Sequence, residues 1–528
     1  MATLSLPETI HQFKTLQASL SDRWQSMETD EQGDADILVV PSFSVDQHEL
    51  QKIDGFLHYE ERLLFSLIRL RNPRTRLIYV TSQPLPPIII DYYLQLLPGI
   101  PFSHARDRLL LVPIYDQSLK PLSQKILERP RLMERIRNAL RPDRAYMVCY
   151  NSTPLERSLS VQLGIPLLAA DPELLYWGTK SGSRQIFAEC GLPHPDGSDL
   201  VKTVDELVKE SALLWERKPQ LQRMVVKLNE GFSGEGNGIL DLTPLYPQLS
   251  LQPSITERMD LLNAHLPSLA FESATESWAH YGDRIPILGA IVESYIEGKP
   301  KYSPSFQGRV TPNGVVEALS THDQILGGPN GQVYLGCRFP ADELYRLKLQ
   351  ELGLKVGQNL SSKGVFERFG VDFVVVPRSE DGTDWDIQAI EINLRKGGTT
   401  HPFMTLKLLT NGEYDTQTGL FTGQKGTPKY YVASDNLQKP HYRGLLPNDL
   451  MDIIAYHHLH FESGSETGSV FHLMGCLSEF GKVGLTSIGN SPEEADAIYR
   501  HVAEVLDAET QATDLSNPAM PLAWCLGQ

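Results

Sequence analysis

Short apolar runs alternate with helical patterns over residues 36–170. The predicted strands of this part are the apolar runs at 36–40, 76–82, 108–115 and 145–150. The segments between them repeat their apolar residues at helical spacing, and such an alternation is typical of a parallel α/β sheet. In the preceding residues 1–35, apolar side chains recur at multiples of a helical turn, which predicts one amphipathic helix. These side chains are Ile10, Phe13, Leu20, Trp24 and Met27.

The pattern changes to an α+β arrangement in residues 171–411. A helix at 203–216 is followed by a strand that ends at Asn229, a glycine-rich loop and a second strand at 239–242. The later elements are predicted strands at 287–296, 315–324, 370–376 and 385–394, with a long helix at 342–366. Strands, then a helix, then strands again favour an α+β fold over a second parallel sheet.

The last part of the chain begins with a polar segment. Residues 412–440 are rich in Gly, Thr, Asp, Asn and Lys and predict a loop or linker. A small α+β lobe follows at 445–507, in which Ser491 and the proline after it form a strong helix start. We therefore divide the chain into an N-terminal helix, an α/β domain, an α+β domain, and a linker with a C-terminal lobe. Their bounds are 1–35, 36–170, 171–411 and 412–528.

Composition and charge narrow the classes of function. The chain has 528 residues and a net charge of −17, which disfavours nucleic acid as a partner. Five cysteines, widely spaced and without a C-x-x-C pair, fit a reducing cytosol. No apolar stretch is long enough to span a bilayer, and the first residues lack the pattern of a secretory signal. We therefore expect a cytoplasmic protein with no membrane partner.

The segment IEINLR at 390–395 is the most informative for chemistry. In a strand, Glu391, Asn393 and Arg395 share one face, and the intervening Ile390, Ile392 and Leu394 pack on the other. A carboxylate, an amide oxygen and a guanidinium in a row suit a magnesium ion that carries phosphate. A solvated polar strand face is the alternative explanation.

A second acidic residue stands close by in the sequence. Asp372 begins a buried apolar run, where a carboxylate is costly unless it is paired or bound to metal. A polar turn at 377–385 separates this run from IEINLR. If the two runs form a hairpin, Asp372 and Glu391 meet across it and can bridge two magnesium ions on one triphosphate.

A lysine and a glycine-rich loop form a candidate phosphate site upstream. Lys227 lies in a predicted strand, and Gly231, Gly234, Gly236 and Gly238 follow it. Glycines let backbone amides approach phosphate oxygens. The spacing matches neither the P-loop nor the dinucleotide fingerprint, and a flexible hairpin turn is the alternative. Lys180 by itself reads as a solvated charge.

Several histidines invite a metal or substrate role. His457, His458 and His460 lie near His472 in the sequence, but no Cys or acid stands at a convincing spacing for zinc. A polar helix end in the C-terminal lobe is the preferred interpretation. His322 and His401 are candidates for the substrate side, or structural histidines.

The order of these parts resembles the ATP-grasp superfamily. The matching parts are Lys180, the GLPHP turn, Lys227 with its glycine loop, VESYIEG at 292–298, Asp372, and Glu391-x-Asn393-x-Arg395. The resemblance implies that Lys180 and Lys227 bind ATP phosphates under a loop that includes Ser233, Gly234 and Gly236. It also implies that adenine contacts a hinge, and that oxygen ligands hold magnesium, with manganese as an alternative. The hinge would be Glu293, Ser294, Tyr295 and Ile296, and the metal ligands Asp372, Glu391 and Asn393.

The flanking lobes resemble the pheganomycin-type peptide ligases. The resemblance rests on VVPSFSVD at 39–46, YEERLL at 59–64, residues 106–116 and the segment 469–495. It implies a Rossmann-like pre-ATP-grasp lobe, an ATP-grasp fold and a small α+β C-terminal lobe. The chain departs from the family pattern at Pro300, where an acid often holds the ribose, and at Gly370, where many amino-acid ligases carry arginine. Arg309, Arg338 or Arg395 must then serve as the catalytic arginine.

The resemblance implies an ATP-dependent carboxylate–amine ligase. An acylphosphate would form, ADP and phosphate would be released, and Lys227, Arg395 and the metals would stabilise the transferred phosphoryl group. The substrates would be a small carboxylate and an amine, each an amino acid or short peptide, and the enzyme could be a homodimer. The alternatives are an ATP-grasp kinase that phosphorylates a small molecule, and a nucleotide-binding regulatory protein without turnover.

Overall fold

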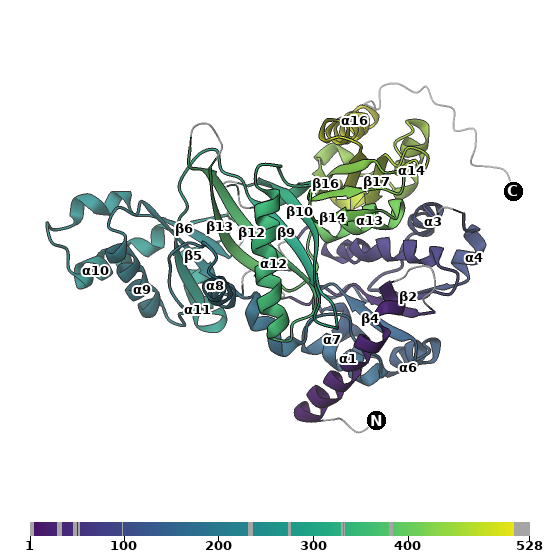
Figure 1. The fold of residues 1–528 in the computed structure, drawn as a ribbon, viewed down its shortest axis with the longest axis horizontal. Helices are drawn as coiled ribbons and strands as arrows, with labels where there is room; N and C mark the ends of the chain where they lie inside the picture. The colour runs from purple at the N-terminus through teal and green to yellow at the C-terminus, as the bar shows by residue number, and fades with distance from the viewer. Residues whose placement is uncertain are drawn as a thin grey trace.

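The structure is a computed structural model in which three lobes surround a central sheet (Figure 1). It describes residues 5–28, 34–45, 50, 53–97, 99–230, 236–272, 276–328, 331, 333–379 and 384–511. The N-terminal lobe lies at the lower right of Figure 1 and the C-terminal lobe above it. The lobe that contains β5 and β6 projects to the left, beyond the large sheet at the centre.

The N-terminal lobe is the parallel α/β unit that the alternation predicts. Its strands pair in the order β3-β2-β1-β4, and every pair is parallel. They are β1 (Asp36–Val40), β2 (Arg76–Thr81), β3 (Leu109–Pro113) and β4 (Ala145–Cys149). The helices are α1 (Leu6–Glu28), η1 (Phe56–Arg71, with 3-10 geometry), α3 (Pro87–Gln95), α4 (Phe102–Arg106), α5 (Leu122–Leu127), α6 (Pro130–Ala139) and α7 (Pro154–Leu163).

The predicted amphipathic helix α1 packs onto this lobe. Phe13 and Leu20 are fully buried, and the Gln17 side chain donates to the Leu167 and Ala169 carbonyls at 3.1 and 2.9 Å. The helical segment expected between the third and fourth strands is divided into α5 and α6, because Pro130 begins a new helix at its first turn.

The left lobe is a small antiparallel sheet covered by helices. Its strand order is β7-β6-β5-β8, and the loop before β6 leads from β5. The strands are β5 (Arg223–Leu228), β6 (Asn237–Asp241), β7 (Ala270–Phe271) and β8 (Ala290–Ser294). Its helices are α9 (Val204–Arg217), η3 (Thr243–Gln248), α10 (Ile255–His265), η4 (Leu266–Ser268) and α11 (Trp278–Leu288). The preceding η2 (Pro172–Gly178) and α8 (Lys180–Glu189) pack against the central sheet instead. The strand expected from residue 287 begins at Ala290, since α11 continues to Leu288 and Gly289, at φ +73°, ends it.

The central sheet has ten strands and is antiparallel. Its main order is β13-β12-β9-β10-β11-β16-β15-β14, and β18 and β17 extend it beside β16. The strands before the C-terminal lobe are β9 (Pro304–Val310), β10 (Val316–Gly327), β11 (Val333–Phe339), β12 (Glu367–Pro377) and β13 (Trp385–Asn393). Helix α12 (Arg346–Ser362) matches the long helix expected here, and Figure 1 shows it lying across the sheet.

The prediction of a loop or linker at 412–440 is wrong. This segment forms β14 (Glu413–Asp415), β15 (Leu420–Thr422) and β16 (Pro428–Gln438). Strand β16 pairs with β11 on one side and β18 on the other, so it lies inside the sheet. Its polar residues are buried because they have partners. Lys429, for example, donates to the Asn490 amide oxygen at 2.8 Å.

The C-terminal lobe follows the expected order of a helix, a strand pair and a helix. Its elements are α13 (Thr400–Thr410), η5 (Pro440–Tyr442), α14 (Pro447–Tyr456), β17 (Gly468–His472), η6 (Met474–Cys476), α15 (Leu477–Phe480), β18 (Lys482–Gly489) and α16 (Pro492–Gln511). The Ser491 hydroxyl accepts from the Glu494 amide at 3.1 Å, which confirms the predicted cap.

The N-terminal and C-terminal lobes share one hydrophobic core. Side chains from β1, η1 and α3 pack in the same cluster as side chains from β17, β18 and α16. The Tyr92 hydroxyl accepts from the Phe471 amide at 3.0 Å, and the Tyr93 hydroxyl donates to the Phe471 carbonyl at 3.2 Å. The left lobe has a separate core around Trp215 and Tyr281. Its residues therefore form a unit that packs independently.

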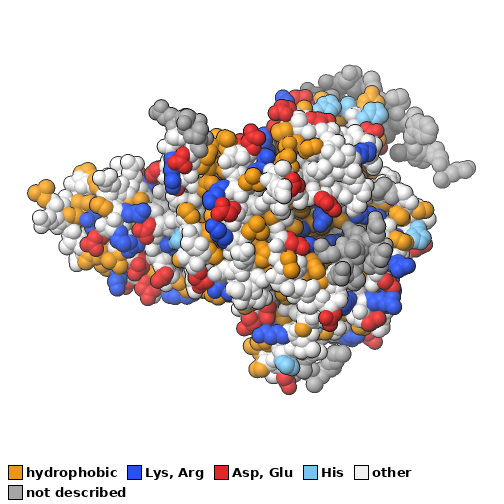
Figure 2. Space-filling view, in the orientation of Figure 1, with side chains coloured by type: hydrophobic (Ala, Val, Ile, Leu, Met, Phe, Trp, Pro, Cys, Tyr) orange, Lys and Arg blue, Asp and Glu red, His pale blue; other side chains and the backbone are white. Residues whose placement is uncertain are grey.

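Charges of both signs are interspersed over the face shown in Figure 2, so the excess of acidic residues does not form a single patch there. Within the described residues, no helix is long and apolar enough to cross a membrane.

Candidate active site

One cavity of ≈ 540 Å³ lies where the lobes meet the central sheet. A volume of this size accommodates small-molecule ligands. Lys227 and Glu293 line it from the left lobe, and Asp372 and Glu391 line it from the central sheet. The N-terminal lobe contributes Tyr59, Arg62 and Tyr150, and the C-terminal region contributes Asn436, Gln438 and Lys482. Residues far apart in the sequence therefore face the same space.

Asp372 and Glu391 stand opposite each other on β12 and β13, as the expected hairpin requires. Directly after this pair the register shifts, and Phe373 pairs with Ala389. Ile390 is the extra residue of this β-bulge and also lines the cavity, so the prediction that it packs away from Glu391 is corrected. Ile392 and Leu394 are buried behind the strand, as expected.

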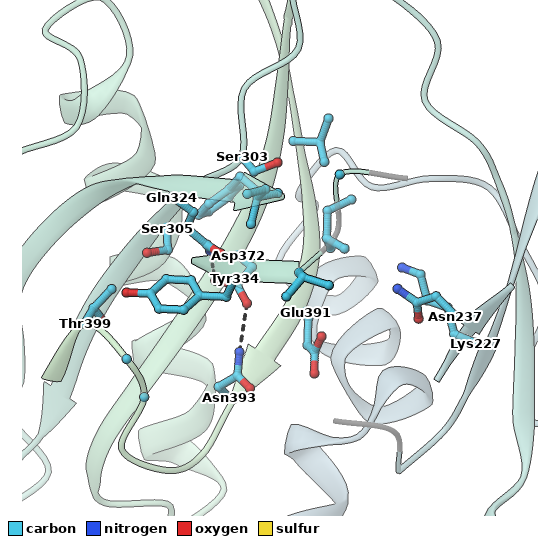
Figure 3. A pocket seen from close by; sticks show the side chains of 18 of the residues that line it. Lys227, Asn237, Ser303, Ser305, Gln324, Tyr334, Asp372, Glu391, Asn393 and Thr399 are labelled. Atoms are coloured by element: carbon cyan, nitrogen blue, oxygen red, sulfur yellow. Dashed lines mark hydrogen bonds between the residues drawn. The ribbon is translucent and has the colours of Figure 1, made fainter. Parts of the chain in front are cut away.

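The Asp372 carboxylate is held by two amides. Gln324 donates to its Oδ1 at 2.8 Å, and Asn393 donates to its Oδ2 at 2.9 Å (Figure 3). The pKa of Asp372 is raised to about 7, mainly by burial and then by the nearby Glu391 carboxylate, against the lowering effect of Arg395 and the two amides. This wall therefore has an excess of acidic oxygen that a cation would neutralise.

The donor set at this wall is made of hard oxygens. Two carboxylates and the amide of Asn393 meet there, and no group of three His, Cys, Asp or Glu side chains forms a metal cage within the described ranges. Magnesium is typically held by one or two carboxylates and completes its shell with waters and substrate phosphates. The residues present therefore fit magnesium better than a fully protein-bound metal.

Lys227 faces this wall from the opposite side of the cavity (Figure 3). Its Nζ lies 2.5 Å from the Glu293 carboxylate, which Arg184 also contacts at 2.7 Å. Burial would raise the pKa of Glu293, but Lys227 and Arg184 outweigh burial and lower it. Glu293 thus stays ionised and fixes both basic side chains.

Lys180 lies behind the wall formed by Asp372 and Glu391 and does not line the cavity. It begins α8, is buried, and its Nζ lies 2.7 Å from Glu391 Oε1. The expectation of a solvated charge is therefore replaced by a buried ion pair.

The last residue of β8 and the segment that follows it line the cavity as a continuous stretch. Ser294, Tyr295 and Ile296 all contribute to the wall. Lys301 covers the Tyr295 ring, with Nζ 4.0 Å from its centroid, and donates to the Ile296 carbonyl at 2.5 Å. Ser233 and Gly234 lie outside the described residues. The carbonyl of Gly236 accepts from the Leu228 amide and from the Tyr281 hydroxyl, each at 2.9 Å.

The three arginines proposed as catalytic are separated by the structure. Arg395 lines the cavity beside Asn393. Arg309 instead pairs with Glu317 on the neighbouring strand and lies over the Trp24 ring. Arg338 is half-exposed and pairs with Asp496 of α16 at 2.8 Å. Arg309 and Arg338 are therefore held away from the cavity by partners in their own surroundings.

The histidines are likewise dispersed. His322 is buried against Tyr431, 2.6 Å from its hydroxyl, and burial lowers its pKa to about 3. His457 pairs with Glu509 at 2.7 Å, and His472 pairs with Asp435 at 2.5 Å. The His401 ring contacts the His472 ring in a tilted arrangement, with centroids 3.9 Å apart. None of these four histidines lines the cavity.

Sequence reasoning missed the end of the cavity formed by Tyr59, Arg62 and Lys482. The Lys482 ammonium donates to the Tyr59 hydroxyl at 2.8 Å, although the two residues are 423 positions apart. The available signals were the resemblances of YEERLL at 59–64 and of the segment 469–495, which gave no role to these side chains.

Comparison with known proteins agrees with this architecture. A family model described as "IQCH-like, ATP-grasp" matches residues 172–260 and 248–417, and a model of the "PGM1 C-terminal domain" matches 449–502. Because a ligase that is 30% identical to this chain aligns with 89% of it, the chain belongs to the ATP-grasp family and is a carbon–nitrogen ligase of that family.

Among its relatives, the L-propargylglycine–L-glutamate ligase of Streptantibioticus cattleyicolor is 30% identical over 480 residues, which are 89% of this chain and 93% of that protein. IQ motif-containing protein H of Danio rerio is 23% identical over 78% of this chain and 42% of its own length.

Solved structures share the fold at low sequence identity. The biotin carboxylase domain dimer of Hydrogenobacter thermophilus 2-oxoglutarate carboxylase, in complex with MgADP, ADP and bicarbonate, has a TM-score of 0.52 and 14% identity over 88% of both chains. A biotin carboxylase–ATP complex from Campylobacter jejuni has a TM-score of 0.52 and 11% identity over 89% of this chain and 90% of that one.

Proposed function

We propose that the protein is an ATP- and magnesium-dependent ligase that joins a carboxylate to an amine through an acylphosphate. One observation carries this proposal. The acidic wall of Asp372 and Glu391 and the basic Lys227 face each other across a cavity that continues beyond them, toward the N-terminal and C-terminal lobes. A triphosphate would fit between the two walls, and an acyl substrate would fit in the remaining space.

In this proposal, the nucleotide occupies the end of the cavity next to the left lobe. Ser294, Tyr295 and Ile296 would contact adenine, and Lys227 and Lys180 would contact phosphates. The loop that carries Ser233, Gly234 and Gly236 would cover the phosphates. Glu293 would act through Lys227, because its carboxylate is already engaged with that lysine and Arg184.

Asp372, Glu391 and Asn393 would hold magnesium, with manganese as a substitute. The bound ion would neutralise phosphate charge during transfer. Arg395 would stabilise charge on the phosphoryl oxygens, since it lines the same wall. The substrate carboxylate oxygen would attack the γ-phosphorus, and ADP would leave. The amine would then attack the acyl carbon and release phosphate.

The substrates we propose are amino acids or short peptides, as both a carboxylate and an amine. The relative that is 30% identical is named for L-glutamate and L-propargylglycine, and the alignment covers nearly all of both chains. A homodimer and a cytoplasmic location remain predictions from the sequence.

The test is an ADP-release screen over L-amino acids and dipeptides, with mass spectrometry of the products. We expect amide product, ADP and phosphate in equal amounts, and a hydroxamate when hydroxylamine replaces the amine. A stable phosphorylated product without hydroxamate would identify a kinase instead. ATP binding without ADP release for any compound would identify a regulatory nucleotide-binding protein.

A further inference from the structure

The end of the cavity between the N-terminal and C-terminal lobes is a polar site built from distant segments. Tyr59 and Arg62 come from η1, and Lys482 is the first residue of β18. Lys482 donates to the Tyr59 hydroxyl at 2.8 Å, and the Arg62 guanidinium lies 4.0 Å from the Tyr59 ring centroid. All three residues line the cavity. Tyr59 therefore holds two cationic side chains at one wall.

Arg62 is electrically balanced within the protein. It forms a close ion pair with Asp435 of β16 and donates to the Tyr150 hydroxyl at 3.1 Å. Burial would raise the pKa of Asp435, but Arg62 and a hydrogen bond with His472 hold it far below its usual range. Asp435 is thus ionised, and the Arg62–Asp435 pair carries no net charge.

The positive charge of Lys482, unlike that of Arg62, is not balanced by a neighbouring carboxylate among the described residues. The Lys482 side chain is only 4% exposed, yet in the part of the chain that the structure describes no carboxylate lies within ion-pair distance of its ammonium. Its hydrogen bond to the Tyr59 hydroxyl uses one of the three N–H donors of the ammonium. The adjacent acid Glu61 accepts from the Gly475 amide at 3.1 Å and does not line the cavity. Asp54 lines the cavity but is exposed to water, which screens its charge.

A buried lysine without a counter-ion is costly, and such a site is completed when an anion binds. The uncompensated charge is a single positive one, which matches a carboxylate better than a phosphate group with its charge of about −1.5 to −2. We propose that Lys482, positioned by Tyr59 and flanked by Arg62, binds a free carboxylate of an amino-acid substrate that does not itself react. This inference rests on the proposed ligase function and names the feature by which the enzyme recognises its substrate.

The carboxylate can belong to either substrate of the ligase. An acyl donor with two carboxylates would present the one that is not activated, and an amino-acid acceptor would present its α-carboxylate. Both sources share the same chemistry, so the experiment contains one arm for each.

The test compares Lys482→Met with the wild-type enzyme on free acids and their α-carboxamides. In the donor arm these are L-aspartate, L-glutamate and their α-carboxamides, which keep a side-chain carboxylate for activation. In the acceptor arm they are the common amino acids and their α-carboxamides. In one arm, the wild type should use the free acid better than the amide by roughly 10- to 100-fold in kcat/KM, as expected for a charged hydrogen bond. Lys482→Met should remove that preference and leave KM for ATP unchanged. The arm that responds identifies which substrate carries the carboxylate.

Lys429→Met is the matched control. Lys429 is 1% exposed on the neighbouring strand β16, but it is paired with Glu466 at 3.3 Å and does not line the cavity. This variant should lower the melting temperature and keep the preference for the free acid. If Lys482→Met does not fold, Tyr59→Phe serves in its place, and it should weaken the same preference about 3- to 10-fold by removing the positioning hydroxyl.

The outcomes separate the two proposals. No ADP release or binding with any of these compounds contradicts the ligase function, and with it the subsite. Turnover in which acid and amide are used equally by the wild type contradicts the subsite alone. An acid preference that survives in Lys482→Met contradicts it as well.

Discussion

The Lys180 ammonium lies 2.7 Å from Glu391 Oε1, so the first residue of α8 is joined to a carboxylate of the acidic wall. Glu391 is also one of the proposed magnesium ligands. The Lys180 ammonium and the cation would therefore compete for the same carboxylate. When the metal binds Glu391, the ammonium of Lys180 would form an ion pair with a bound phosphate instead. Nucleotide and metal would then bind more tightly together than either does alone.

Lys180→Met should separate these two effects. Without its lysine partner Glu391 is more available, so Mn²⁺ alone should bind several-fold more tightly. ATP should bind at least about tenfold more weakly, because a charged phosphate contact is lost. Calorimetric titration with Mn²⁺ alone and with ATP measures both. Lys363→Met, which breaks the ion pair to Glu189 at the other end of α8, is the control and should change neither. Weaker Mn²⁺ binding in Lys180→Met would contradict the competition.

Lys227 should contribute to both stability and nucleotide affinity. Lys227→Met removes one of two cations from buried Glu293, so the melting temperature should fall, and KM for ATP should rise at least about tenfold. The double variant with Glu293→Gln should recover the melting temperature and leave KM for ATP high. Unchanged nucleotide affinity in both variants would indicate that this lysine is purely structural.

Magnesium binding should depend on pH around neutrality. The pKa of Asp372 is about 7 in the metal-free protein, so protons compete with the metal below that value. The apparent affinity for Mg²⁺ should fall by up to about tenfold per pH unit below 7 and level off above it. A titration series from pH 5.5 to 8.5, chosen to bracket this pKa, measures the effect. Asp372→Asn should bind weakly with no such dependence.

The same shift predicts how the metal-free protein responds to pH. Folded Asp372 keeps its proton up to about pH 7, whereas the unfolded chain releases it near 4. The unfolded state thus binds fewer protons between these values, and this residue lowers the free energy of unfolding as pH rises through that window. Denaturant titrations should show a smaller decline for Asp372→Asn. An equal decline would argue against the raised pKa.

The arginines should differ sharply in their effect on turnover. Arg395→Ala should lower kcat about 100-fold or more if its guanidinium stabilises the transferred phosphoryl group. Arg338→Ala should stay within about twofold of the wild type, because that side chain pairs with Asp496 outside the cavity. Steady-state ADP release measures both variants. Similar losses in the two would contradict the assignment of Arg395.

The alternation of apolar and polar residues made some features of the site predictable, but other features have no such pattern in the sequence. The pairing of Asp372 with Glu391 followed from two period-two runs around a polar turn. The β-bulge that turns Ile390 toward the cavity has no such signal, since it depends on the register of the partner strand. Strand β16 was missed because Lys429, Ser434 and Asp435 are polar yet buried with partners. Lys482 and Tyr59 meet only through tertiary folding, so neither could be assigned a role beforehand.

The core shared by the N-terminal and C-terminal lobes has a consequence for biosynthesis. The apolar face of η1 and α3 is covered by α13, α14 and β17, which leave the ribosome roughly 350 to 400 residues later. At usual elongation rates this is a delay of roughly 20 to 80 s. During that interval the nascent chain exposes an apolar surface around Tyr93. Chaperones would shield this surface until Phe471 has been synthesised and packs against it.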